Sequence, residues 1–374
     1  MSNLSKVKLQ DVATIQTGKL DSNAAVENGL YPFFTCDPKT LSIDTWAYDT
    51  EAVLLAGNNA SGNYTAKYYC GKFNAYQRTY IIESKFSDIL NTKFLSYAIN
   101  QQLCLLKSMS AGSTTKFLTM RMLNNLSLFL PSVAYQNRIA SILSAYDDLI
   151  ENNQKQIKLL EEAAQRLYKE WFVDLRFPGW ENTKIVDGVP EGWEKLPLSS
   201  FADIVMGQSP KSEFYNTTHD GIPFHQGVGS YGKRFVVDNI FSNSYARIAE
   251  AGSILFSVRA PVGRLNITKN KIAIGRGLAA LNHKKGYQSF LFYLLKDRFF
   301  KDDLLGNGSI FASISKNELY NQVFIVPNNF LANQYNIIVS KIDRKISIID
   351  EQLNRLVKTR DGLLSKLMNA KMEV

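Results

Sequence analysis

The most regular pattern in the chain is an apolar stripe that begins near Gln136. Apolar or small residues recur there at alternating spacings of three and four, with one polar position at Asn153. Residues at this spacing share one face of a helix, as in coiled coils. The stripe consists of Ile139, Leu143, Tyr146, Ile150, Asn153, Ile157, Leu160, Ala164, Leu167 and Trp171. We therefore predict a long helix over Gln136–Phe172 with an apolar seam along it.

A second copy of this stripe closes the chain, over Asn333–Met368. It consists of Val339, Ile342, Ile346, Ile349, Leu353, Leu356, Leu363 and Leu367, with Arg360 as its polar exception. Two helices with matching stripes are expected to pair, and we predict an antiparallel coiled coil within the chain. Asn153 and Arg360 can either fix the register of that pair or lie in solvent. The alternative, in which each helix packs only on its own domain, fits poorly with such long helices.

The repeat extends well beyond the helices. Eight residues recur identically 196 positions later: Phe94, Leu95, Tyr97, Gly112, Ser113, Leu123, Asn125 and Pro131 correspond to Phe290, Leu291, Tyr293, Gly308, Ser309, Leu319, Asn321 and Pro327. Further upstream, Gly18 corresponds to Gly207 and Gln77–Arg78 to Gly275–Arg276, with drifting offsets. A changing offset indicates loops of different length on a shared scaffold. The chain is therefore predicted to be a tandem duplication.

Each half is predicted to contain a globular domain of mixed α/β (α+β) structure followed by one long helix. Short β-rich runs lie between Gly, Asn and Pro turn signals, at Ala52–Ala56, Tyr76–Ile82, Leu126–Leu130 and Ser253–Val258. Shorter helices are predicted at Thr92–Leu106 and Gln288–Phe299. The predicted segments are a first domain over 1–133, a first helix over 134–175, a linker over 176–190, a second domain over 191–330 and a second helix over 331–374.

Composition adds a weak indication of the partner. The chain carries 43 Lys and Arg against 34 Asp and Glu, which gives a formal charge of +9. That excess favours a polyanionic partner but also fits plain solvated surface. The N-terminal sequence MSNLSKVKLQ lacks the apolar core of a signal peptide, and no run approaches the roughly 18 apolar residues that a membrane span needs. We expect a soluble cytoplasmic protein that does not engage a membrane.

Motifs of catalysis are not evident in the sequence. The segment GVGSYG over 227–232 matches GxGxxG, but the β-like run KRFVVDNIF follows it, so we predict a hairpin or an exposed loop rather than a nucleotide site. There is no GxxxxGK[ST] segment, and the three histidines show neither metal nor triad spacing. We predict no catalytic residues, no metal site and no cofactor in this chain.

Polar residues in the predicted loops could instead contact DNA. Asn and Gln can read adenine, Arg can read guanine, and Lys or Tyr can contact phosphate. The candidates are Asn58, Asn59, Tyr64, Lys67, Lys72, Gln77 and Arg78 in the first domain, and Gln226, Lys233, Arg234, Arg259, Arg264 and Arg276 in the second. For any single one of them, ordinary surface exposure is a commoner role than base contact. Because Arg78 and Arg276 correspond in the repeat, we expect them to be structural or to face phosphate.

The chain resembles the specificity subunit of type I restriction-modification enzymes over nearly its whole length. The linker WFVDLRFPGWENTKIVDGVPEGWEKLPL is similar to the central segment of that family. MGQSPKSEFYN, GIPFHQG, ILFSVRAPVG and IAIGRGLAAL resemble one of its target-recognition domains, and GKFNAYQRTYII resembles another. One departure is that Gln136 follows Pro131 by five residues whereas Gln334 follows Pro327 by seven. The two helix starts are therefore not expected to be strictly equivalent.

The resemblance implies a non-catalytic subunit that binds double-stranded DNA. Each domain would read one half of an interrupted site, and the paired helices would set the gap and dock two modification subunits. Those partners would carry S-adenosylmethionine and methylate a flipped adenine, while restriction subunits would bring ATP and Mg²⁺. Two other functions compete with this hypothesis. One is a self-contained methyltransferase or nuclease with degenerate motifs, and the other is a coiled-coil scaffold that binds no DNA.

Overall fold

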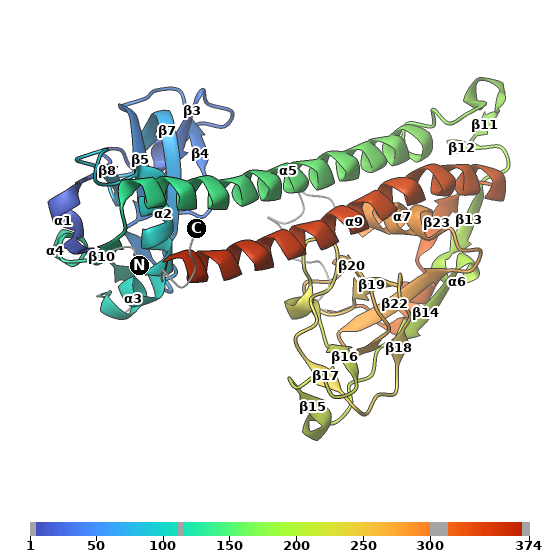
Figure 1. Ribbon diagram of the computed structural model, residues 1–374. Coiled ribbons are helices and arrows are strands. Elements are labelled where there is room, and N and C mark those ends of the chain that lie inside the picture. The colour runs from blue at the N-terminus through green and yellow to red at the C-terminus, as the bar shows by residue number, and fades with distance from the viewer. Residues whose placement is uncertain (1–4, 111, 113–114, 300–312, 369–374) are drawn as a thin grey trace. The chain divides into compact units, whose positions relative to one another are not determined.

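The protein, seen in a computed structural model, consists of two compact units that share its two long helices. The structure describes residues 5–110, 112, 115–299 and 313–368. Unit 1 comprises Met1–Gln154 with Glu351–Val374, and unit 2 comprises Lys155–Asp350 (Figure 1). Three of the repeat positions, Ser113, Gly308 and Ser309, lie outside the described residues.

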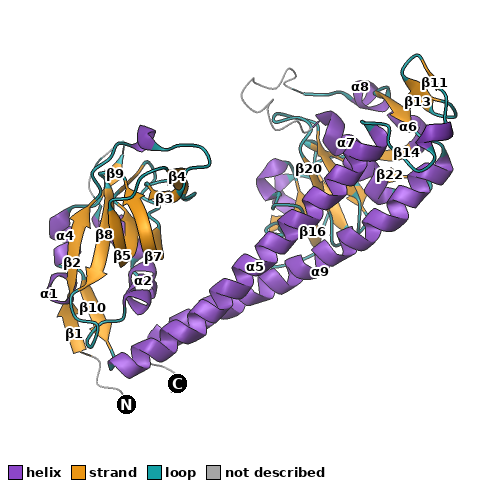
Figure 2. Ribbon diagram, turned by 90° about the horizontal axis from the view of Figure 1, so that it is seen from above, coloured by secondary structure: helices purple, strands orange, loops and turns teal. Residues whose placement is uncertain are grey.

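Unit 1 is built on a six-stranded sheet. In spatial order its strands are β2 (Ala13–Thr17), β8 (Thr79–Ser84), β5 (Tyr48–Ala56), β7 (Ala66–Ala75), β3 (Tyr31–Phe34) and β4 (Leu41–Ile43). Only β3 and β7 pair in parallel among these strands. The helix α2 (Thr92–Gln101) packs against β5 and β7 (Figure 2). Its buried face includes Phe94, Leu95 and Ile99, which join Val53 and Leu55 of β5 in the core.

Short elements outside this sheet complete unit 1. The strand β1 (Ser5–Lys8) pairs antiparallel with β10 (Ser127–Leu130), and β6 (Asn58–Asn59) pairs with β9 (Lys116–Phe117). The remaining helical elements are α1 (Leu9–Val12), the 3-10 turn η1 (Ser22–Ala24), α3 (Leu103–Met109) and α4 (Met120–Asn124). The predicted helix over Thr92–Leu106 is therefore wrong as a single element, because Gln102 leaves helical geometry at φ −96° and ψ 5° and separates α2 from α3.

Unit 2 divides its strands between two sheets. One has the order β14 (Ala202–Met206), β22 (Leu278–His283), β19 (Ile254–Ser257) and β20 (Leu265–Ile267). The other has the order β15 (Tyr215–Asn216), β17 (Phe241–Ser242), β16 (Ile222–His225), β21 (Ile272–Ile274) and β18 (Ile248–Ala249). Here β16 and β21 form the parallel pair. The helices are α6 (Leu198–Phe201), α7 (Gln288–Phe299) and α8 (Lys316–Tyr320), with 3-10 turns η3 (Ser212–Phe214) and η4 (Val228–Ser230).

The two units repeat one fold, which confirms the predicted duplication. The sheet order β2-β8-β5 in unit 1 recurs as β14-β22-β19 in unit 2. The antiparallel pair β1–β10 recurs as β13 (Glu194–Pro197) with β23 (Val323–Val326), and α2 recurs as α7. The predicted linker contains the turn η2 (Trp180–Asn182) and a small hairpin of β11 (Ile185–Val186) and β12 (Val189–Pro190).

The two long helices are equal in length and start at equivalent positions. α5 spans Val133–Phe172 and α9 spans Asn329–Met368, 40 residues each. Each begins two residues after the proline of its repeat, Pro131 or Pro327. The expectation that their starts are not strictly equivalent is therefore wrong. Both starts also lie a few residues before the predicted ones, because the apolar stripe alone does not mark the first turn.

Within each unit α5 and α9 run antiparallel, and the apolar residues of their seam are shielded from solvent. In unit 1, Ile139 and Leu143 near the start of α5 share a core with Leu363 and Leu367 near the end of α9. In unit 2, residues 164–171 of α5 share a core with residues 331–339 of α9. All predicted seam residues are buried or half-buried, Asn153 at 9% exposure included.

Packing on the domains explains why the compact units differ from the five predicted segments. Ala164, Tyr168 and Trp171 of α5 lie in the same core as Phe290 and Leu291 of the second domain. The first part of α5 packs in the same way on the first domain. Each helix therefore pairs with the other along the seam and also contributes to both domain cores. Pairing of the helices and packing on the domains were predicted as alternatives, but both occur.

Candidate nucleic-acid interface

A tight turn after β7 presents two of the candidate residues in unit 1. Gln77 and Arg78 are exposed there and line a cavity of about 300 Å³, together with Thr17, Gly57 and Tyr80. The backbone is held on several sides: Gln77 N donates to Leu20 O at 2.8 Å, and Gly57 N donates to Arg78 O at 2.8 Å. The turn is thus a rigid platform at the edge of a cavity large enough for a polar ligand group.

The equivalent turn of unit 2 follows β21 and carries Arg276. Gly277 N donates to Gln226 O at 3.1 Å, and Arg276 N donates to Ser209 Oγ at 3.2 Å. Both Gln226 and Arg276 are exposed. The structure therefore brings these two candidates together, although they are far apart in the sequence.

Hydrogen bonds correct the predicted alignment of these two turns by one residue. Val258 N donates to Gly277 O as Gly57 N donates to Arg78 O, and Leu278 N donates to Gly275 O as Thr79 N donates to Tyr76 O. Gly277 is thus the counterpart of Arg78, and Arg276 is the counterpart of Gln77. The prediction that Arg78 and Arg276 correspond is wrong, because identity of residue type misled the alignment across a loop of changed length.

Glycines allow close backbone approaches beside both turns. A Cβ on Gly18 would lie 2.1 Å from Ala75 O, and a Cβ on Gly207 would lie 2.0 Å from Gly275 O. Real Cβ atoms do not approach so closely. The residues directly after β2 and β14 can therefore pass the turns after β7 and β21 only because they are glycines. The predicted correspondence of Gly18 and Gly207 is confirmed.

The other candidates of unit 1 differ in whether their side chains are already engaged in contacts within the protein. Asn59 Oδ1 accepts hydrogen bonds from Ser61 N at 2.9 Å and Asn63 N at 3.1 Å, so it shapes its own loop, and Asn58 beside it is half-buried. Lys67 Nζ donates to Asp37 O at 3.1 Å, and burial lowers the pKa of this lysine. Lys72 is exposed, with its ammonium 4.6 Å from the ring centroid of Trp46.

Tyr64 is not a surface residue. It is 5% exposed and lies in the core of unit 1 with Leu106 and Leu118. The prediction that it contacts DNA is corrected by this burial. A tyrosine between Asn and Thr in a polar run gives no sequence signal that its ring turns inward.

In unit 2, a second cavity of about 290 Å³ gathers further candidates. Lys233 and Arg264 line it, together with Tyr231 and Asn266. Lys233 is exposed and Arg264 half-buried. Arg259 is exposed at the end of β19 and forms an isolated bridge with Ser313.

A buried histidine orders the loop between Gln226 and Lys233. His225 is 1% exposed, its Nδ1 lies 2.8 Å from Ser230 Oγ, and its Nε2 lies 2.9 Å from Asp238 Oδ1. The hydrogen bond with His225 lowers the pKa of Asp238. Ser230 Oγ also donates to Gly227 O at 3.2 Å. The GVGSYG segment is thus a loop, as predicted, but it is mostly half-buried and Ser230 ties it to His225. The spacing of the histidines in the sequence does not reveal this contact.

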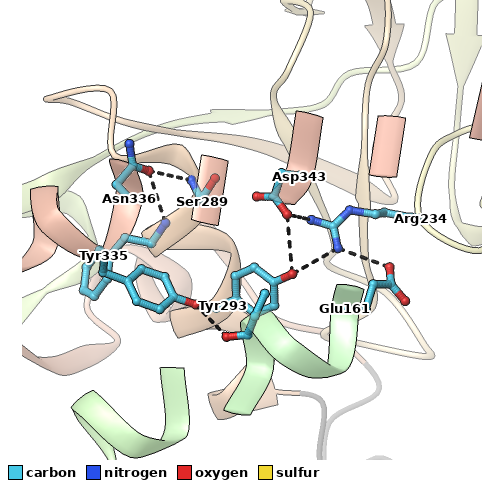
Figure 3. A network of polar contacts seen from close by, with 9 residues as sticks. Glu161, Arg234, Ser289, Tyr293, Tyr335, Asn336 and Asp343 are labelled. Carbon is cyan, nitrogen blue, oxygen red and sulfur yellow. Dashed lines mark hydrogen bonds and ion pairs between the residues drawn. The ribbon is translucent and has the colours of Figure 1, made fainter. Parts of the chain in front are cut away.

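Arg234 is buried in a polar network on the long helices (Figure 3). Its guanidinium donates to Glu161 of α5 at 3.1 Å and to Asp343 of α9 at 2.5 Å, and it lies 3.3 Å from the hydroxyl of Tyr293. Only 4% of its side chain is exposed. The prediction that Arg234 contacts DNA is therefore corrected: this arginine ties the second domain to α5 and α9.

Part of this network recurs in unit 1. Tyr97 OH donates to Asp147 of α5 at 2.5 Å, as Tyr293 OH donates to Asp343 of α9 at 3.4 Å. Both residues of the pair recur 196 positions later. The cation differs: in unit 1 it is Arg360 of α9, which donates to Asp147 at 2.9 Å. Arg360, the polar exception of the seam, therefore has a partner in the structure.

The part of the chain that the structure describes offers neither a metal site nor a membrane-spanning helix. No group of three or more His, Cys, Asp or Glu residues in that part of the chain is arranged to hold a metal ion. Nor does any helix in it combine the length and apolar character that a membrane crossing requires.

The structure therefore defines a duplicated mixed α/β chain whose two domains present corresponding turns with different polar side chains. The chain belongs to the family described as the type I restriction modification DNA specificity domain, whose profile matches residues 1–162 and 190–358. The two matches coincide with the two copies of the fold.

Curated relatives carry names of the same kind. A protein of Methanocaldococcus jannaschii, provisionally named type I restriction enzyme MjaX specificity subunit, is 34% identical over 259 residues, which are 67% of this chain and 60% of that protein. The type I restriction enzyme EcoDI specificity subunit of Escherichia coli is 32% identical over 236 residues, 57% of this chain and 52% of that protein. The matched regions thus span between half and two thirds of these relatives.

A solved structure shares the fold over nearly the whole chain. The S subunit of a type I restriction-modification system from M. genitalium superposes with a TM-score of 0.68, covering 98% of this chain and 96% of that one. The sequence identity is 19%. At that identity the likeness concerns the fold.

Proposed function

We propose that this chain is the DNA sequence-recognition subunit of a type I restriction-modification complex. Each globular domain reads one half of a bipartite site in double-stranded DNA. The observation that carries this proposal is the duplication: two copies of the specificity-domain fold, each continuing into a helix of 40 residues. Two readers in one chain suit a site made of two separated halves, as dimers suit palindromes elsewhere.

In this proposal α5 and α9 set the gap between the half-sites and dock two modification subunits. Support comes from apolar side chains that the helix seam leaves uncovered. Leu149 and Leu159 of α5 are 50% and 63% exposed, and Ile348 of α9 is 46% exposed. Charged residues such as Glu162, Arg166 and Lys169 accompany them on α5. Uncovered apolar positions among charges are typical of protein interfaces.

The chemistry belongs to the partner subunits in this proposal. The modification subunits hold S-adenosylmethionine and methylate the DNA, and restriction subunits hold ATP and Mg²⁺. The chain itself contributes recognition without catalysis, and it works in the cytoplasm, where the DNA is. Support for this division comes from the relatives, which are named as specificity subunits.

Salt-dependent DNA binding distinguishes a DNA reader from a coiled-coil scaffold. We expect the complex of this chain with modification subunits to bind sheared genomic duplex DNA, with the logarithm of affinity falling linearly as the logarithm of salt concentration rises, by about 0.9 per phosphate contact. Fluorescence anisotropy between about 50 and 200 mM salt measures this slope. A complex that assembles normally but does not bind DNA at the lowest salt would refute the proposal.

A further inference from the structure

The turn after β7 in unit 1 and the turn after β21 in unit 2 occupy the same place in the duplicated fold. The hydrogen bonds described above align Tyr76 with Gly275, Gln77 with Arg276 and Arg78 with Gly277. The two domains thus share a backbone position at which one carries glutamine and the other arginine. Both side chains are exposed.

The backbone at this position is fixed in both units. In unit 1, Gln77 N donates to Leu20 O at 2.8 Å and Thr79 N donates to Tyr76 O at 2.8 Å. In unit 2, Arg276 N donates to Ser209 Oγ at 3.2 Å and Leu278 N donates to Gly275 O at 3.0 Å. A side chain on a fixed backbone can present its polar atoms with little loss of freedom on binding.

The neighbouring positions are less suited to a shared reading role. A Cβ at Gly277 would lie 2.4 Å from Gln226 O, and a Cβ at Gly275 would lie 2.9 Å from Gln226 Cα. Unit 2 therefore has room for a side chain only at the middle of the three positions. Arg78 has no counterpart side chain, so it can serve only the first domain.

The side chains of Gln77 and Arg276 are not used by the fold. Among the described residues neither makes a side-chain hydrogen bond or ion pair, in contrast to Arg234 with its three partners. Gln77 also borders the cavity of about 300 Å³ with Gly57 and Phe117, so a ligand group can reach its amide. Exposed donors without an internal partner on a rigid turn are suited to an external partner.

The two side chains differ in their hydrogen-bonding groups, so they suit different bases. A glutamine amide can pair with N6 and N7 of adenine, and an arginine guanidinium can pair with O6 and N7 of guanine. We propose that this shared position is a base-reading position, where Gln77 recognises an adenine in one half-site and Arg276 a guanine in the other. This inference rests on the proposed function and adds to it a residue and a base for each half.

The test uses the full chain in complex with its modification subunits, with the methylated motif determined by sequencing. Gln77→Ala is expected to make one A·T position degenerate in one half-site, with discrimination there falling about 10- to 100-fold. Arg276→Ala is expected to make one G·C position degenerate in the other half-site, by a similar factor. Gln10→Ala and Arg176→Ala, which remove exposed residues of the same types elsewhere, should leave the motif unchanged.

Two results would overturn the inference. One is an unchanged motif in both variants. The other is a uniform loss of methylation at all sites with the motif retained, which would indicate phosphate contacts instead of base contacts. A bipartite motif in the unsubstituted complex keeps the proposed function intact in either case, whereas no bipartite motif at all would refute both proposals.

Discussion

Replacing Arg234 with methionine is expected to lower the free energy of unfolding of unit 2 by about 3–5 kcal/mol, the usual effect of removing one member of a buried ion pair. The substitution keeps an unbranched side chain but leaves Asp343 and Glu161 without their shared cation. Burial raises the pKa of Asp343, while Arg234 acts in the opposite direction. The guanidinium also lies 4.5 Å from the ring centroid of Phe292, a contact that methionine only partly replaces.

Hydrogen exchange of amides in α7, measured by mass spectrometry, reports this loss in unit 2 separately from unit 1. Arg247→Met is the matched control, because Arg247 is exposed in the same unit, and it should change stability by no more than about 0.5 kcal/mol. Adding Asp343→Asn to Arg234→Met should restore part of the loss, since the more deeply buried of the two carboxylates left without a cation is then neutral, whereas Glu161 is 30% exposed. Equal effects of Arg234→Met and Arg247→Met would contradict the role of the network.

The pH dependence of the Arg234→Met variant follows from the same argument. With no cation beside it, the buried Asp343 carboxyl has a folded-state pKa above its unfolded value. Protonation is then more favourable in the folded state, so the deficit is largest near neutral pH and shrinks as the pH falls through the raised pKa. Comparing the deficit near neutral pH with that in mild acid checks the sign.

Exchanging residues 1–133 for the corresponding domain of another family member is expected to change one half of the methylated motif completely and leave the other half unchanged. The reason is that the first domain has its own sheet and core, so the second domain retains its own fold and turn. The new domain must keep the tyrosine equivalent to Tyr97, which donates to Asp147 of α5. Sequencing of methylated DNA gives both halves at once.

The control for this exchange is a chimera in which the new domain's tyrosine equivalent to Tyr97 is also replaced by phenylalanine. Loss of its hydroxyl should reduce methylation without altering either half of the motif, because the pair positions the domain on the helix. Changes in both halves of the motif after the exchange alone would refute independent reading by the two domains.

The long helices and the duplication could be predicted from the sequence because each rests on many residues that agree. The seam is a periodic pattern of apolar positions, and burial of its members follows directly from that period. The repeat was visible from identical residues at a single offset, and the shared sheet order confirmed it. A seam pattern does not show, however, that Trp171 and Leu367 also pack into domain cores.

The details of the candidate interface were harder to predict because they depend on single side chains. Arg234 is predicted to contact DNA only because of its residue type. Its actual partners, Glu161 and Asp343, lie in two other elements, and only the tertiary structure brings them together. The recurrence of Asp147 as Asp343 at the repeat offset is the signal in the sequence that points to such a polar contact in both units. Likewise, only the hydrogen bonds of the turn could show that Gln77, and not Arg78, corresponds to Arg276.

The most direct test of the central claim is methylome sequencing of a host that expresses this chain together with its modification subunits. We expect one bipartite motif, with two specified halves separated by a fixed number of unspecified base pairs. Removing one heptad, residues 157–163, from α5 should change that number or prevent assembly. A continuous motif, or no methylation from a complex that assembles normally, would contradict recognition by two domains held apart by paired helices.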